Sequence, residues 1–262
     1  MLTATSRDGT RIAFWRSGDG PRLLLVHGVI ADHTTTWRYV LPSLEQRFSV
    51  YAMDRRGRGG SGDAERYALA REAEDVAAVV DSIGEPVNVL GHSYGGLCSL
   101  EAALLSPNVR RLILYEGVHR RGSDNYRPGL IDQLDAMLAA GHVEDMLVTM
   151  LRDLVGMPAE EIGLLRSQPE AWARRLGNAP TIPRELRADE AYRFAPERFR
   201  DMRQPTWLLV GGDSPARERE SAEAIAVLLP DARVAMLPGQ QHLAMYTAPE
   251  AFVAEVVRFL EG

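Results

Sequence analysis

The segment 91–96, Gly-His-Ser-Tyr-Gly-Gly, carries the residue types that could perform covalent chemistry in this chain. It contains the pattern Gly-x-Ser-x-Gly, follows the short apolar run 87–90 and precedes a helical pattern at 97–105. A serine on such a strand-to-helix turn has a strained backbone that exposes its hydroxyl. The flanking glycines are expected because a Cβ there would collide with the neighbouring strand or helix. We therefore predict that Ser93 is a nucleophile.

A serine hydroxyl is a poor nucleophile at neutral pH unless a base removes its proton and a third group orients that base. If the chain order is serine, acid, histidine, the base is a histidine late in the chain. His242 fits, because it follows the apolar run 234–237 and precedes the helical pattern 249–260. We predict that His242 is the base.

Two carboxylates are candidates for the group that orients His242. Asp213 lies in the loop after the apolar run 207–210, and it is the predicted acid. Glu116 follows the run 112–115 and could reach the same histidine from the neighbouring strand end, so it is the alternative. If it has no such role, Glu116 is expected to be a pocket-wall or cap-anchoring carboxylate.

Acyl transfer also requires hydrogen-bond donors aimed at the developing oxyanion. One predicted donor is the backbone N–H of Tyr94, directly after the nucleophile. The second is expected in the loop after the apolar run 23–27, where a His-Gly pair lets the backbone turn inward. Val29 is the predicted donor in that loop, and Ile30 is the alternative.

The elements that must position these residues alternate along the chain, as in a parallel sheet covered by helices. The first strand, after Asp8-Gly9, is expected in an antiparallel hairpin at the sheet edge. Between residues 118 and 204 no strand pattern is clear, which predicts a helical cap over the carboxyl ends of the strands. The core domain is then 1–117 and 205–262. Strands are expected at 12–16, 23–27, 50–54, 87–90, 112–115, 207–210 and 234–237, and helices at 37–47, 68–83, 97–105, 217–229 and 249–260.

Composition is that of an ordinary globular protein, with 262 residues, 45% hydrophobic and 25% charged. The net charge of −6 argues against a nucleic-acid surface. All 30 basic residues are arginine, which excludes chemistry based on a lysine Schiff base. The single cysteine, Cys98, cannot form an internal disulfide, and no signal segment or membrane-length apolar run is evident. We expect a cytoplasmic protein.

Together these motifs resemble the α/β-hydrolase superfamily, in the capped branch of serine esterases, haloperoxidase-like perhydrolases and C–C bond hydrolases. The matching residues come in the family's order: His27-Gly28, the loop 54–61, the segment 91–96, Asp213 and His242. The resemblance implies an eight-stranded, mostly parallel sheet with a helical cap inserted after the sixth strand. It also implies that loop 54–61, with its glycines and arginines, is a structural turn packed beside the active site.

The predicted function is a serine hydrolase that cleaves small-molecule carboxylic esters through an acyl-enzyme on Ser93. A C–C bond hydrolase, a perhydrolase or a lyase with the same triad is the alternative, and a non-catalytic ligand-binding homologue is a lesser one. No metal, cofactor, nucleic acid or membrane insertion is expected, and the oligomeric state is left open. Candidate pocket residues are Ile30, Glu116, Met137, Met146, Met150 and Leu243.

Overall fold

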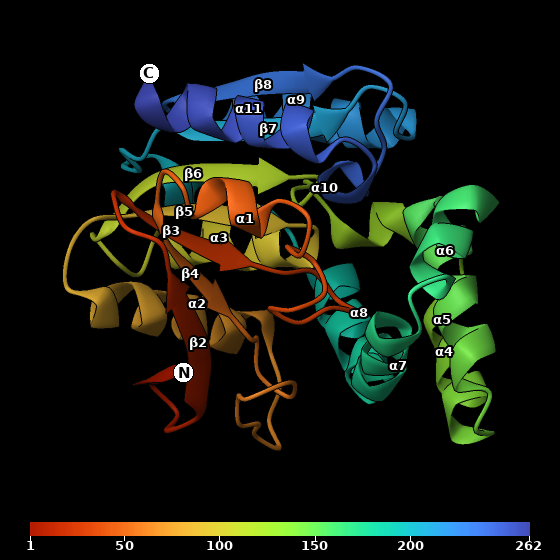
Figure 1. The fold of residues 1–262 in the computed structure, drawn as a ribbon. Coiled ribbons are helices and arrows are strands. Elements are labelled where there is room, and N and C mark those ends of the chain that lie inside the picture. The colour runs from red at the N-terminus through yellow and green to blue at the C-terminus, as the bar shows by residue number, and fades with distance from the viewer.

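A mostly parallel sheet of eight strands forms the centre of the molecule. Figure 1 shows the fold of the computed structural model, which describes residues 1–262. The strand order is β1-β2-β4-β3-β5-β6-β7-β8. β1 pairs antiparallel with β2 and β2 with β4, and the remaining pairs are parallel. The predicted fold class and edge hairpin are therefore confirmed. The strands are β1 (Leu2–Thr5), β2 (Arg11–Ser17), β3 (Arg22–Val26), β4 (Ser49–Met53), β5 (Val87–His92), β6 (Val109–Tyr115), β7 (Thr206–Gly211) and β8 (Ala232–Leu237).

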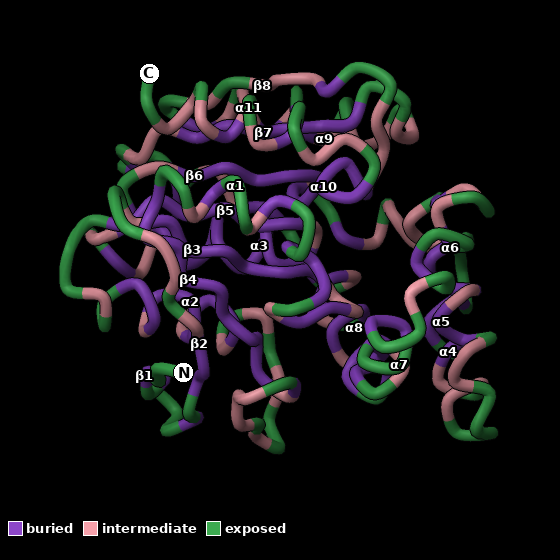
Figure 2. Tube along the Cα trace, in the orientation of Figure 1, coloured by how far each residue is buried: buried purple, intermediate pink, exposed green.

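Helices cover both faces of the sheet, so the central strands are buried on both sides (Figure 2). Successive β3 side chains enter opposite cores: Leu23 and Leu25 join one hydrophobic cluster, and Leu24 and Val26 join the other. The Leu23 cluster includes Phe252 of α11, whereas the Leu24 cluster includes residues of α2 and α3. The helices of the core are α1 (Leu41–Leu44), α2 (Leu69–Ile83), α3 (Tyr94–Ala102), α9 (Ala216–Ala226), α10 (Ala244–Thr247) and α11 (Pro249–Glu261).

The helix expected at 37–47 is much shorter, because α1 covers only Leu41–Leu44. Pro42 lies in its first turn, where a missing N–H is tolerated but cannot continue a preceding helix. Trp37 and Val40 still point into the core, so their helical spacing reflected burial rather than a continuous helix.

A helical insertion, defined here as the segment between β6 and β7, lies beyond the sheet end to which the parallel strands point (Figure 1). It contains no strand, only an isolated bridge between Arg121 and Arg193. Buried apolar side chains of its α-helices join the Leu23 cluster, whereas Val118 and the residues Tyr192, Phe194, Phe199 and Met202 after α8 join the Leu24 cluster, so the insertion packs with both cores of the sheet. No helix of the protein combines the length and apolarity that crossing a membrane requires. The insertion's α-helices are α4 (Leu130–Ala139), α5 (Val143–Met150), α6 (Ala159–Arg166), α7 (Pro169–Asn178) and α8 (Ile182–Ala191).

Candidate active site

Ser93 occupies the sharp turn between β5 and α3. Its backbone has φ 53° and ψ −133°, a conformation that is strained for a residue with a side chain. Hydrogen bonds hold the turn: Ser93 N–H donates to Tyr115 O at 2.9 Å, and Gly96 N–H donates to Ser93 O at 2.7 Å. A Cβ on Gly95 would lie 2.3 Å from His27 O, which explains why glycine is required beside this serine. The local geometry is that predicted from the Gly-x-Ser-x-Gly pattern.

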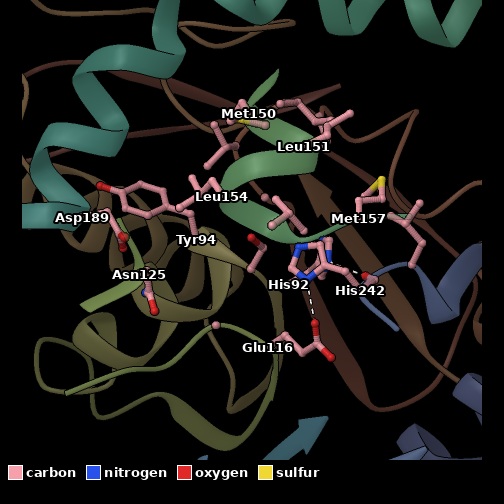
Figure 3. Close-up of a pocket in the computed structure, with 18 of the residues that line it drawn as sticks. His92, Tyr94, Glu116, Asn125, Met150, Leu151, Leu154, Met157, Asp189 and His242 are labelled. Carbon is pink, nitrogen blue, oxygen red and sulfur yellow. Dashed lines mark hydrogen bonds and ion pairs between the residues drawn. The ribbon is translucent and has the colours of Figure 1, made fainter. Parts of the chain in front are cut away.

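His242 lies in the loop between β8 and α10, and it lines the same cavity as Ser93. Its Nδ1 is 2.7 Å from Glu116 Oε2 (Figure 3). With the proton assigned to Nδ1, the imidazole donates to the carboxylate and its Nε2 remains free to accept a proton. His92 Nε2 lies 3.1 Å from His242 O, and this hydrogen bond fixes the loop that carries the imidazole.

Glu116 directly follows β6 and, like Ser93, has a positive φ, at 47°. These two are the only residues other than glycine with this backbone conformation. The turn buries the carboxylate, whose Oε1 accepts hydrogen bonds from Gly211 N–H, at 2.8 Å, and from the Ser214 hydroxyl. Its Oε2 remains for His242, so both carboxylate oxygens are engaged.

The prediction that Asp213 lies against His242 does not agree with this geometry. The Asp213 side chain is exposed and makes no hydrogen bond or ion pair. The hydrogen bond of Asp213 comes from its backbone: Asp213 N–H donates to Gln240 O at 2.9 Å. The physical reason is that the chain turns after β7, so that Gly211 and Ser214 face Glu116 while Asp213 faces solvent. The alternative weighed from the sequence, Glu116, occupies the position beside the imidazole.

The charges of this pair reinforce each other. Burial disfavours the imidazolium, but the hydrogen bond and charge of Glu116, aided by Glu218 and Glu161, raise the pKa of His242 above its ordinary value. Burial also disfavours the Glu116 carboxylate, yet the hydrogen bonds that it accepts lower its pKa. The pair therefore favours the charged form of both groups, the imidazolium and the carboxylate.

The backbone of the loop after β3 approaches Ser93 closely. A Cβ built on Gly28 would lie 3.0 Å from Ser93 Cβ. Val29 and Ile30 both line the cavity, and neither N–H donates to any protein acceptor. Tyr94 begins α3, where first-turn N–H groups have no partner within the helix. These groups are available to an oxygen bound beside Ser93.

The cavity that contains Ser93 has a volume of about 130 Å³ and is lined mainly by hydrophobic residues. Four of the predicted pocket residues line it: Ile30, Glu116, Met150 and Leu243. The predictions for Met137 and Met146 were wrong, because neither lines the cavity. Met146 is fully buried in the apolar core of the insertion, and Met137 packs against that core.

A second group of polar side chains lies in the part of the cavity wall that the insertion contributes. Tyr126 Oη donates to Asp189 Oδ2 at 2.9 Å, and His119 Nε2 lies 3.3 Å from Asp189 Oδ1. Burial raises the pKa of Asp189. Figure 3 shows Asp189 and Asn125 on one side of the cavity, with His242 and Glu116 on the other. Asp189 could not be predicted as a cavity residue from the sequence, because a single aspartate in an amphipathic helix carries no motif.

No group of three or more histidine, cysteine or carboxylate side chains is arranged to hold a metal ion. Cys98 is buried in α3, and burial raises the pKa of its thiol well above the ordinary value. The lining of the cavity includes Ser93, His242 and the carboxylates of Glu116, Asp189 and Glu218.

Known proteins are similar to this chain in sequence and in architecture. The alpha/beta hydrolase family profile matches residues 23–256. A pimeloyl-[acyl-carrier protein] methyl ester esterase of Nitrosospira multiformis is 29% identical, over 92% of this chain and 95% of its own length. An alpha/beta hydrolase structure from Sphaerobacter thermophilus is 34% identical with a TM-score of 0.85, covering 99% of this chain and 100% of that chain. An esterase structure from Rhodococcus, 24% identical, covers 100% of this chain and 98% of its own with a TM-score of 0.70, a likeness of fold. The profile match and the Sphaerobacter relative, taken with the sheet and the serine turn, show that the chain belongs to the alpha/beta hydrolase family.

Proposed function

We propose that this protein hydrolyses carboxylic esters, with Ser93 as nucleophile, His242 as general base and acid, and Glu116 as the orienting acid. The observation that carries the proposal is the 2.7 Å hydrogen bond between His242 Nδ1 and the buried Glu116 carboxylate, in the cavity that Ser93 lines. The esterase name of the Nitrosospira relative supports the ester bond as the target.

In the first half-reaction, His242 Nε2 takes the proton of the Ser93 hydroxyl as Oγ bonds to the ester carbonyl carbon. The carbonyl oxygen becomes an oxyanion that accepts hydrogen bonds from the N–H groups of Val29 and Tyr94. The carbon–oxygen bond to the alcohol then breaks, and the proton on His242 passes to the departing alcohol. An acyl-enzyme on Ser93 remains.

In the second half-reaction, a water molecule attacks the acyl carbon while His242 removes its proton. The bond between the acyl carbon and Ser93 Oγ breaks, and the same proton returns to Oγ. The carboxylic acid leaves. Throughout, Glu116 stays ionised and stabilises the imidazolium, which agrees with the lowered pKa of Glu116 and the raised pKa of His242.

In this proposal the helical insertion acts as a cap over the substrate site. It contributes Met150, Leu151 and Met157 to the cavity wall, and these flexible or branched apolar groups suit an acyl chain. The core contributes the reacting groups. We propose the boundaries 118–204 for the cap, which enclose α4 to α8.

The test is hydrolysis of p-nitrophenyl acetate, butyrate and octanoate by the wild type, Ser93→Ala and Ser167→Ala. Ser93→Ala is expected to lower kcat/KM on the order of a thousandfold or more, as removal of a triad nucleophile does. Ser167 is exposed at the end of α6, and its substitution is the matched control that should leave turnover unchanged. Wild-type turnover no faster than that of Ser93→Ala on every ester would refute the proposal.

A further inference from the structure

The peptide unit that joins Gly28 to Val29 is held from its carbonyl side. Gly28 O accepts hydrogen bonds from His27 Nδ1 at 2.8 Å and from Arg55 Nη1 at 3.2 Å. The chain has no cis peptide bond, so the Val29 N–H points opposite to the Gly28 carbonyl. Gly28 and Val29 line the cavity and Arg55 does not. The hydrogen bond from Arg55 therefore holds the Gly28 carbonyl on the side away from the cavity, which leaves the Val29 N–H on the side towards the cavity.

The next peptide unit, which joins Val29 to Ile30, is also held from its carbonyl side, by a second arginine. Arg58 Nη1 donates to Val29 O and, at 3.5 Å, to Ala31 O. The side chains of Arg55 and Arg58 are fully buried, and both come from the arginine-rich loop 54–61. Two buried cations thus bind consecutive carbonyl groups of the loop after β3.

Arg55 also contacts the residue that carries the other oxyanion donor. Its guanidinium carbon lies 4.7 Å from the centre of the Tyr94 ring, in a cation–π arrangement. The Tyr94 hydroxyl is held in turn by the Tyr67 hydroxyl at 3.0 Å. One buried side chain therefore contacts Tyr94 and the Gly28 carbonyl, which belongs to the peptide unit that carries the Val29 N–H.

The counter-ions of these arginines come from two parts of the molecule. Glu72, on α2 of the core, binds Arg55 through both carboxylate oxygens. Glu185, on α8 of the helical insertion, accepts from Arg55 Nη2 at 2.8 Å through one oxygen and from Arg58 Nη2 through the other. Glu185 is the only carboxylate that pairs with Arg58, and both side chains are fully buried.

We propose that Arg55, Arg58 and Glu185 are positioning residues for the oxyanion donors. In this proposal Glu185 couples the packing of α8 against the core to the orientation of the Val29 N–H. The inference rests on the proposed ester hydrolysis. It assigns a role in transition-state binding to a residue of the insertion that does not line the cavity. Because a carbonyl bound to a cation polarises its own peptide, the hydrogen bond from Arg55 to Gly28 O also makes the Val29 N–H a stronger donor.

The test compares a p-nitrophenyl ester with its thionoester, in which sulfur replaces the carbonyl oxygen. An oxyanion site built for oxygen favours the oxoester, because the larger sulfur anion is a weaker acceptor. Glu185→Gln is expected to lower kcat for the oxoester about 10- to 100-fold, less than the loss of a whole donor. KM should change less than twofold, and the ratio of oxoester to thionoester kcat/KM should fall at least fivefold.

Two further variants separate positioning from general damage. Arg187 is an exposed residue of the same helix that pairs only within the insertion, so Arg187→Gln should leave the ratio unchanged. Arg58→Lys keeps the buried charge but cannot bridge Val29 O and Glu185 together, and it should lower the ratio even if Glu185→Gln fails to fold. Thermal unfolding confirms which variants are folded.

An unchanged ratio in a folded Glu185→Gln or Arg58→Lys protein, whether or not overall activity falls, would overturn the inference. That outcome differs from failure of the proposed function, which would appear as absence of Ser93-dependent turnover in the wild type.

Discussion

The two walls of the cavity are built differently. On the core wall, Glu116 accepts hydrogen bonds on both oxygens, and both Ser93 and Glu116 are held in strained backbone conformations. On the wall that includes the insertion, Asp189 has one hydrogen bond, from Tyr126, and the nearby His119 Nε2 has none. The core wall is therefore held rigidly by its hydrogen bonds, as the proposed reaction requires, while the other wall has a polar atom without a partner in the protein.

The largest loss of activity is expected from a substitution on the core wall that removes the charge of Glu116. Glu116→Gln removes the charge that orients His242 and stabilises its protonated form. We expect kcat to fall about 10⁴-fold, as in triads whose acid is replaced by its amide. Asp213→Asn is the matched control, and because its side chain is exposed and unbonded it should keep kcat within about twofold of wild type. Steady-state hydrolysis of p-nitrophenyl butyrate measures both, and the reverse ranking would reinstate Asp213.

A smaller effect is expected from crowding the nucleophile without removing any functional group. In Gly28→Ala the new methyl would lie 3.0 Å from Ser93 Cβ, so one of them must shift. A displacement of this kind is expected to lower kcat/KM about 100-fold while the protein stays folded. Labelling of Ser93 by a fluorophosphonate should slow in parallel. Gly163→Ala, at an open helical position, serves as control, and equal labelling rates in both variants would contradict the expectation.

The pH dependence of kcat/KM tests the electrostatic coupling between His242 and Glu116 on the core wall. His242 must be neutral to act as a base, and the raised pKa of His242 means that it stays protonated to a higher pH than a free imidazole does. The acid limb of kcat/KM should therefore have its midpoint above 6.5, with activity lost as pH falls. In Glu116→Gln, loss of the carboxylate should move this limb to lower pH. A limb that does not move between the two proteins would show that Glu116 does not set the pKa of His242.

The smallest effect is expected on the opposite wall. Tyr126→Phe removes the hydrogen bond to Asp189 without touching Ser93 or His242. It should change the relative kcat/KM for acetate and octanoate esters by less than about tenfold, the size of a pocket contact. The kcat for acetate should stay near the wild-type value. A loss as large as that of Glu116→Gln would mean that both walls take part in the reaction.

Motifs with strict backbone requirements were predictable from the sequence. The turn at Ser93 and the His-Gly loop follow from glycine spacing beside apolar runs, because close backbone approach excludes a Cβ there. The alternation of strands and helices was predictable for a different reason, because short apolar runs and helical spacing are local patterns. In contrast, Met137 and Met146 have flexible apolar side chains of the kind that line pockets. The direction of each side chain within the packed helices decides which methionines reach the cavity.

By itself, the sequence predicted the fold class, the turn at Ser93 and the loop that carries His242, since each leaves a local pattern of glycines, apolar runs and helical spacing along the chain. Only the tertiary structure shows that Glu116, and not Asp213, lies beside His242, because the two residues follow adjacent strands and their order along the chain does not say which carboxylate reaches the imidazole. It also decided that Glu185 meets the arginines of loop 54–61. That contact joins segments about 130 residues apart, and no local pattern encodes it.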